Sequence, residues 1–141
     1  MSRNECHMTE RLGQQLKEHV DILAGEIGER NIFRPGTLDE ARNYIASVWH
    51  KQGYEVKEQP YQVRGVQCAN LEVSCLGTVR ADAVILVGAH YDSVKGSPGA
   101  NDNGSGVAAM LELLRLFARL RPAVSVRFVA FVNEEPPFFL W

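Results

Sequence analysis

The stretch "AVILVGAH", residues 83–90, decides the fold of this chain. It opens with five consecutive apolar residues, which is typical of a strand that other elements cover on both faces. A similar stretch, "VSVRFVAFV", spans residues 124–132. Between them, apolar residues recur at helical spacing from about residue 105 to 120, and Pro122 follows. Strand, helix and strand in this order predict a βαβ unit with two parallel strands.

Two further helices are expected before this unit. Apolar residues at three- and four-residue steps over 9–29 predict an amphipathic helix. The sequence "TLDE" predicts that a second helix starts at Thr37, in a capping box with Glu40. Gly53 is expected to end this helix, because glycine adopts the left-handed conformation that often follows a last helical turn.

A β-hairpin is expected next in the chain. Residues 54–63 and 66–76 read as two strands joined by a turn at residues 64–65. Pro60 cannot donate to a strand ladder, so the first strand should lie at a sheet edge or carry a bulge. The whole pattern predicts an α/β fold in one domain over residues 1–141. The expected architecture is a mixed β-sheet sandwiched by helices in three layers.

Composition excludes several classes of partner. The chain of 141 residues has 15 Lys and Arg against 17 Asp and Glu, a formal net charge of −2. This balance gives no attraction to nucleic acid or to an anionic membrane. No apolar stretch is long enough to span a bilayer, and the N-terminus lacks the apolar core of a secretory signal. A cytoplasmic location without a membrane partner is therefore the expectation.

Polar residues follow both apolar strands at their carboxyl ends. His90 and Asp92 come after the first strand, Glu134 and Glu135 after the second, and Asp102 directly precedes the connecting helix. In open parallel sheets, ligands bind beyond the carboxyl ends of the strands. The five side chains should therefore gather along one edge of the sheet, in the arrangement of a metal site.

Taken one at a time, these residues have ordinary explanations. His90 with Asp92 could be a loop histidine beside a carboxylate, and Asp102 could be an acid that caps a helix. The pair of glutamates could be a solvated turn. In a metal site, Asp92 could orient His90 or bind the metal itself. A carboxylate such as Asp102 has two oxygens, so it can bridge two metals about 3.5–4 Å apart.

Three motifs together resemble a known family. The segments "VGAHYDS", "GANDNGSGVA" and "FVNEE" are similar to those of the co-catalytic di-zinc aminopeptidases of the aminopeptidase Y type. The resemblance implies that His90 binds one zinc, Glu135 binds the other, and Asp102 bridges both. It implies that Asp92 orients His90 and that Glu134 is the general base. The resemblance also implies two zinc ions per complete site, and peptide or protein N-termini as substrates.

Other readings stay open. Zinc carboxypeptidases and deacylases use similar residue types but usually separate the first two motifs more widely than His90 and Asp102 are separated here. Glutaminyl cyclases share the fold and hold one zinc. A protein of another class, a non-catalytic peptide- or protein-binding domain, could keep the same scaffold without binding zinc.

The chain departs from the family pattern after Glu135. The family takes one more aspartate and one more histidine as zinc ligands, and neither residue type follows Glu135 in this sequence. We therefore expect the N-terminal portion of a zinc-peptidase-like domain, truncated after the strand that leads to Glu134 and Glu135. Such a chain should bind zinc weakly or with partial occupancy and cleave little or nothing. Its exposed sheet edge and apolar tail predict self-association.

Overall fold

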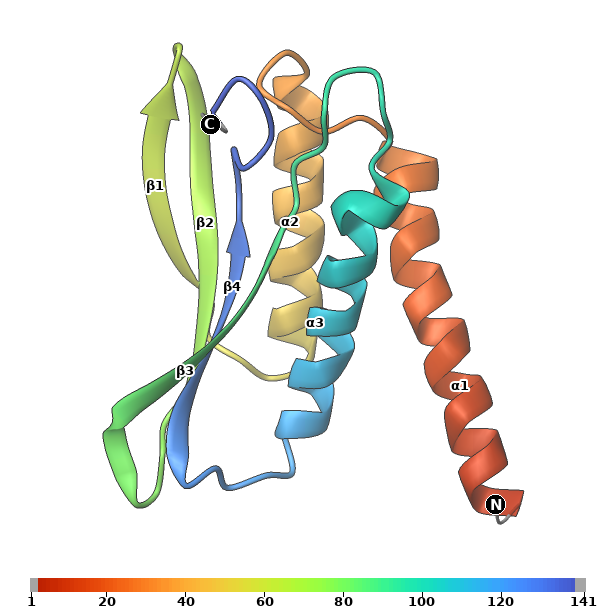
Figure 1. Ribbon diagram of the computed structural model, residues 1–141, viewed down its shortest axis with the longest axis vertical. Helices are drawn as coiled ribbons and strands as arrows, with labels where there is room; N and C mark the ends of the chain where they lie inside the picture. The colour runs from red at the N-terminus through yellow and green to blue at the C-terminus, as the bar shows by residue number, and fades with distance from the viewer. Residues whose placement is uncertain (1–2, 139–141) are drawn as a thin grey trace.

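The computed structural model, which describes residues 3–138, contains a mixed four-stranded sheet (Figure 1). Its strands lie in the order β1-β2-β4-β3. The neighbours β1, β2 and β4 pair antiparallel, whereas β3 and β4 pair parallel. The parallel pair confirms the predicted βαβ unit, and the edge position of β1 agrees with Pro60. The strands are β1 (Lys57–Val63), β2 (Val66–Cys75), β3 (Arg80–His90) and β4 (Val124–Phe131).

The helices lie on one face of this sheet (Figure 1). Helix α3 packs on β3 and β4, α2 packs on β2, and α1 packs on α3. Within residues 3–138, no helix combines the length and the apolarity that a bilayer crossing requires. The helical elements are α1 (Arg3–Val20), the π-helix η1 (Asp21–Ile27), α2 (Pro35–Lys51), the short π-helix η2 (Ala100–Gly104) and α3 (Ser105–Phe117).

The start of α2 differs from the prediction. The helix begins at Pro35 rather than Thr37, and Thr37 makes no capping box. Proline suits the first helical position because its fixed φ is already helical and it has no N–H to leave unpaired. Thr37 lies inside the first turn, where its hydroxyl donates to the carbonyl oxygens of Glu29 at 2.6 Å and Arg34 at 2.9 Å. The predicted end is confirmed, since Gly53 follows the helix with φ +89°.

The core lies between the sheet and the helices. Trp49 of α2, Leu71 of β2 and Phe128 of β4 are fully buried there. Alternate residues of β2, β4 and β3 point to the same side, because Leu71 pairs with Ala130 and Ala130 with Ala89. One face of the sheet therefore packs against the helices.

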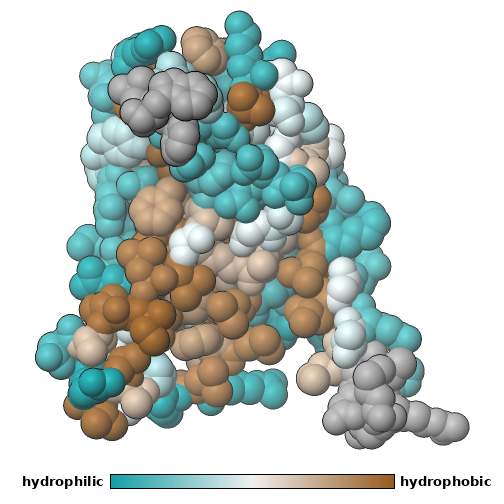
Figure 2. All heavy atoms as spheres, in the orientation of Figure 1, coloured by the Kyte–Doolittle hydropathy of each residue, from teal (hydrophilic) through white to brown (hydrophobic). Residues whose placement is uncertain are grey.

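The central part of β3 is more exposed than predicted. Val84, Ile85 and Leu86 keep 47%, 53% and 57% of their surface accessible. Brown side chains gather over this part of β3 in Figure 2. The α/β class and the mixed sheet are confirmed, but the expected cover on both faces of β3 was wrong for residues 3–138. These residues place β3 at a sheet edge and all their helices on one face, so they form two layers rather than three.

Candidate metal centre

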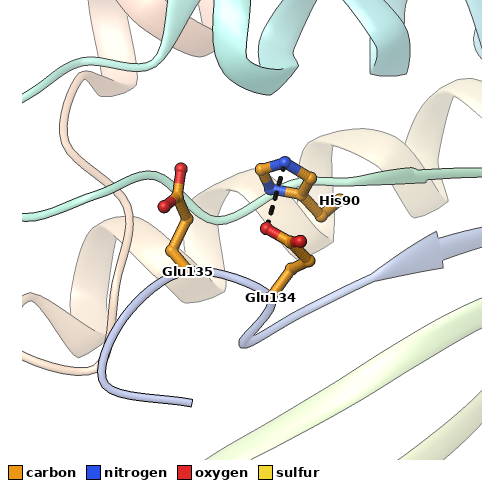
Figure 3. A group of neighbouring side chains, drawn as sticks. All are labelled: His90, Glu134 and Glu135. Carbon is orange, nitrogen blue, oxygen red and sulfur yellow. Dashed lines mark ion pairs between the residues drawn. The ribbon is translucent and has the colours of Figure 1, made fainter. Parts of the chain in front are cut away.

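Three of the predicted site residues meet at the carboxyl ends of the parallel strands. His90 is the last residue of β3, and its register partner Phe131 is the last residue of β4. Glu134 and Glu135 follow β4 and turn back towards the imidazole (Figure 3). One nitrogen of His90 and one carboxylate oxygen from each glutamate lie within 4.8 Å of one another.

The imidazole of His90 has carboxylates on both sides. Its Nε2 lies 3.0 Å from Oδ1 of Asp102 and 3.6 Å from Oε2 of Glu134. Its Nδ1 lies 3.2 Å from the carbonyl oxygen of Asp92 and 3.5 Å from Oδ1 of the same residue. Nε2 is therefore the nitrogen that faces Asp102 and Glu134, while Asp92 holds the opposite side of the ring. All five predicted site residues are brought together, and their individual roles remain predictions.

Asp92 joins the two strand ends. Its side chain is almost fully buried, and its two oxygens accept the backbone N–H groups of Glu134 at 3.3 Å and Glu135 at 3.1 Å. A buried carboxylate needs such partners, because an unpaired charge costs far more free energy when it is buried than when water surrounds it. The position of both glutamates is thus tied to the segment that carries His90.

Asp102 does not act as a helix cap. The side chain that accepts an N–H in the first turn of α3 belongs to the next residue, Asn103, whose Oδ1 bonds the N–H of Gly106 at 3.1 Å. The side chain of Asp102 is 74% exposed and turns to His90 instead. The alternative of an ordinary capping acid is therefore not what the structure shows.

Residues that sequence reasoning missed support the corner after β4. The N–H of Val132 donates to Oδ1 of Asn70 at 3.0 Å, and the hydroxyl of Tyr61 donates to the carbonyl of Val132 at 2.8 Å. Asn133 adopts φ +63° and donates to the Tyr61 hydroxyl at 3.0 Å. Tyr61 and Asn70 lie on the distant hairpin, where their residue types are ordinary. Among these residues only Asn133 gives a sequence signal, and it is a weak one, because asparagine is enriched at positions with positive φ.

The clustered carboxylates shift the pKa of the groups between them. Burial disfavours the charged imidazolium of His90, but the hydrogen bond and charge of Asp92, the charge of Glu134 and the hydrogen bond to Asp102 outweigh it and raise the pKa to about 9. Burial, followed by the charge of Asp102, raises the pKa of Glu135. The site therefore favours positive charge at its centre, where a bound dication would replace the proton of His90.

The residues present fit a zinc ion. Oε1 of Glu135 is buried without a hydrogen-bond partner, although it is an acceptor beside an imidazole. Imidazole nitrogen and carboxylate oxygen are ligands that zinc binds readily. A cation at this point would satisfy the buried oxygen and neutralise part of the acidic cluster. Zinc thus fits the donor set of His90, Asp102 and Glu135, with Glu134 beside them.

An α/β sheet with imidazole and carboxylate groups at the carboxyl ends of two parallel strands defines the class, an α/β protein with a candidate metal centre. Comparison with known families adds a peptidase resemblance. The sequence model of peptidase family M28 matches residues 70–139, which include all five site residues. Over this part of the chain, the match and the aminopeptidase names of relatives support a zinc-aminopeptidase-like family.

Individual relatives agree with the family. The chain is 35% identical over 134 residues to the uncharacterized protein YfbL of Escherichia coli K12, an alignment that covers 89% of this chain and 41% of YfbL. It is 52% identical over 52 residues to the aminopeptidase YwaD of Bacillus subtilis, covering 37% of this chain and 11% of that protein. The chain therefore spans less than half the length of these curated relatives.

Solved structures share the fold. The zinc aminopeptidase BSAP from Bacillus subtilis superposes with a TM-score of 0.76 at 15% identity, over 84% of this chain and 60% of BSAP. The glutaminyl cyclase of Macrostomum lignano superposes with a TM-score of 0.74 at 24% identity, over 91% of this chain and 40% of the cyclase. At these identities the likeness shows the fold alone.

Proposed function

We propose that this site belongs to a di-zinc metallo-aminopeptidase that hydrolyses N-terminal peptide bonds. The observation that carries the proposal is the meeting of His90 and Glu135, from different strand ends, around a buried carboxylate oxygen that has no partner. The aminopeptidase names of relatives such as YwaD support the choice of reaction.

His90, Asp102 and Glu135 would hold the metal. His90 and Glu135 would each bind one ion, and Asp102 would bridge the two. When bound, zinc polarises a carbonyl and lowers the pKa of a water ligand from 15.7 to about 7.

Glu134 is assigned as the general base. Its side chain is 48% exposed, so water and substrate can reach it, and its Oε2 lies on the Nε2 side of His90. Glu134 takes a proton from the attacking water and delivers it to the leaving amine. Asp92 holds the Nδ1 side of the imidazole and so orients the ring.

For the 141-residue chain we propose weak zinc binding and little or no cleavage. Catalytic zinc normally has three protein ligands, and the three assigned ligands here are shared between two ions. Rapid hydrolysis of leucyl anilides by the purified chain would overturn this part of the proposal.

The function is tested by product analysis at high protein concentration with added zinc. Peptides with varied N-termini are incubated for long times and examined by mass spectrometry. Loss of a single N-terminal residue in the wild type, absent in Glu134→Gln, is the expected result. Measurable cleavage at the same rate in both proteins would contradict it.

A second candidate is a glutaminyl cyclase, because several solved cyclases share the fold. This enzyme would release ammonia from N-terminal glutamine and leave the peptide bonds intact, which the same mass spectra distinguish. A non-catalytic binding domain predicts bound peptide without zinc and without any product. A carboxypeptidase would shorten the opposite end, and a deacylase would remove only an acyl group.

A further inference from the structure

A buried arginine lies outside the candidate metal centre. It contacts the loop that carries two of the residues of that centre, Asp92 and Asp102. Arg30 follows η1, and the whole residue has 0% of its surface exposed. Burial lowers the pKa of Arg30 to about 10, partly offset by the charge of Asp92, so the guanidinium keeps its proton at neutral pH. A buried charge is costly unless it is fully hydrogen-bonded, so the partners of Arg30 show what it does.

The guanidinium of Arg30 donates to five main-chain carbonyl oxygens. Three of the five belong to the segment 91–99, which links His90 to the η2 element with Asp102. The remaining two belong to the chain just before Arg30. The acceptors are Tyr91 at 2.8 Å from Nε, Leu23, Gly28 and Pro98 at 2.7, 2.7 and 2.6 Å from Nη1, and Gly99 at 3.2 Å from Nη2.

The backbone of Arg30 is bound to the same loop. The N–H of Ser93 donates to the carbonyl of Arg30 at 2.7 Å, and the N–H of Arg30 donates to the hydroxyl of Ser93 at 3.0 Å. That hydroxyl donates in turn to the carbonyl of Ser97 at 2.9 Å. Ser93 is itself fully buried, so water does not compete for these bonds.

The loop is packed closely against the guanidinium. A Cβ added at Gly99 would meet the carbonyl oxygen of Asp102 and Cβ of Ser93 at 2.6 Å, and Nη2 of Arg30 at 3.2 Å. A Cβ at Gly104 would meet the carbonyl oxygen of Gly99 at 2.9 Å. The glycines of this loop let it close around Arg30 rather than leave it pliable.

We propose that Arg30 is a positioning residue that fixes segment 91–104, and with it Asp92 and Asp102, in the metal-binding arrangement before any ion arrives. This inference rests on the proposed function, since it concerns the same metal site. The planar guanidinium has five N–H donors, and all of its hydrogen bonds here go to main-chain carbonyls of two chain segments. A lysine has its three N–H donors on one nitrogen, so it cannot reach carbonyls of segment 91–99 and of the chain before residue 30 at the same time.

The test compares Arg30→Lys and Ser93→Ala with two controls in the full 141-residue chain. Arg34→Met changes a neighbouring arginine whose side chain is 60% exposed. Ile45→Ala removes core packing from α2 and reproduces a general loss of stability. The readouts are amide hydrogen exchange over residues 91–104 without metal and the affinity and absorption spectrum of bound Co²⁺, all where every variant is folded.

We expect Arg30→Lys to speed exchange in residues 91–104 by tenfold or more and to weaken Co²⁺ binding by about 10–100-fold, the usual effect of losing a residue that supports metal ligands. Ser93→Ala should shift both readouts in the same direction by less. Both controls should stay within threefold of the wild type. If Arg30→Lys behaves like Ile45→Ala in both readouts, Arg30 is only a stabilising residue and the inference fails.

Hydrogen exchange measured without metal separates this inference from the proposed function. If the wild type binds no Co²⁺ or zinc, the proposed function fails, and exchange in residues 91–104 alone decides whether Arg30 fixes the loop.

Discussion

The buried carboxylate of Asp92 accepts the backbone N–H of Glu135 at 3.1 Å, across the gap between the ends of β3 and β4. The two carboxylate oxygens of Asp92 therefore position two parts of the site. They hold the ring of His90 from the Nδ1 side, and they hold the corner that carries both glutamates. This carboxylate therefore links the segment that carries His90 to the corner that carries both glutamates.

Replacement of Asp92 by asparagine tests this link. The amide group would bring N–H donors against the N–H of Glu134 or Glu135 and would remove the charge beside His90. Asp92→Asn should weaken zinc binding by about 10–100-fold, measured by competition with a chelating dye. Asp82→Asn, at an exposed position of β3, should bind zinc as the wild type does. Equal affinity in the two variants would contradict the role of Asp92.

Loss of charge at each of the two adjacent glutamates should affect zinc binding differently. Glu135 is the assigned ligand with the unpartnered oxygen, and Glu134 is the assigned base. A ligand at 100 times its Kd stabilises a protein by about 2.7 kcal/mol, so zinc should raise the Tm of the wild type. Glu134→Gln should keep most of this rise, and Glu135→Gln should lose it. The opposite order would exchange the two assignments.

The loop glycines offer a prediction about stability. Gly96 and Gly99 both have positive φ, +86° and +59°, but only Gly99 lacks space for a side chain. Alanine at either position should cost about 1–2 kcal/mol of backbone strain. Gly99→Ala should cost a further 1–3 kcal/mol or so from overpacking. Urea unfolding measures both values, and equal losses would show that the close packing at Gly99 is unimportant.

The place of the site was predictable from sequence, because it follows from topology. Two apolar strands joined by a helix must run parallel, so the residues after each strand meet at one edge. His90, Glu134 and Glu135 needed no further information. Asp92 could be assigned to the site, but its bonds to the N–H groups of the glutamate corner were invisible in the pattern.

The role of Arg30 and the exposure of β3 could not be predicted, for different reasons. Arg30 bonds to main-chain carbonyls, which every residue has, so no pattern of side chains points to it. In the sequence "ERNIF" it reads as a surface loop residue. The apolar run around Ile85 looks the same whether neighbours cover it or not, because burial depends on elements elsewhere in the fold.

The half-buried Tyr44 predicts how stability changes at high pH. Burial, followed by the charges of Glu18, Glu26 and Glu112, raises the pKa of Tyr44 to about 12. The unfolded chain loses this proton near pH 10, whereas the folded chain keeps it. The folded state thus binds more protons in this window, so its stability is full below pH 10 and falls as the pH rises towards 12.

Tyr44→Phe removes that dependence, and its urea midpoint should therefore fall less steeply between pH 10 and 11 than that of the wild type. Lysine titration is common to both proteins and cancels in the comparison. Parallel slopes would show that Tyr44 titrates alike in the folded and unfolded chains.

The last prediction concerns β3, an edge strand of the sheet that residues 3–138 form. The opposite edge, β1, carries Lys57, Glu58 and Pro60, residue types that discourage strand pairing. The middle of β3 has no charge and no proline, and its side chains are about half exposed. We propose that two copies of the chain pair antiparallel about Ile85, which makes a symmetric contact.

Sedimentation velocity should then show association that grows with concentration. Ile85→Lys places two like charges opposite each other at the centre of that contact and should weaken association by tenfold or more, since each 1.4 kcal/mol of repulsion and lost burial changes the constant tenfold. Leu76→Lys makes a comparable exchange at a residue 75% exposed between β2 and β3 and should leave association unchanged. An equal loss in both variants would mean that general hydrophobicity, and not pairing of β3, joins the copies.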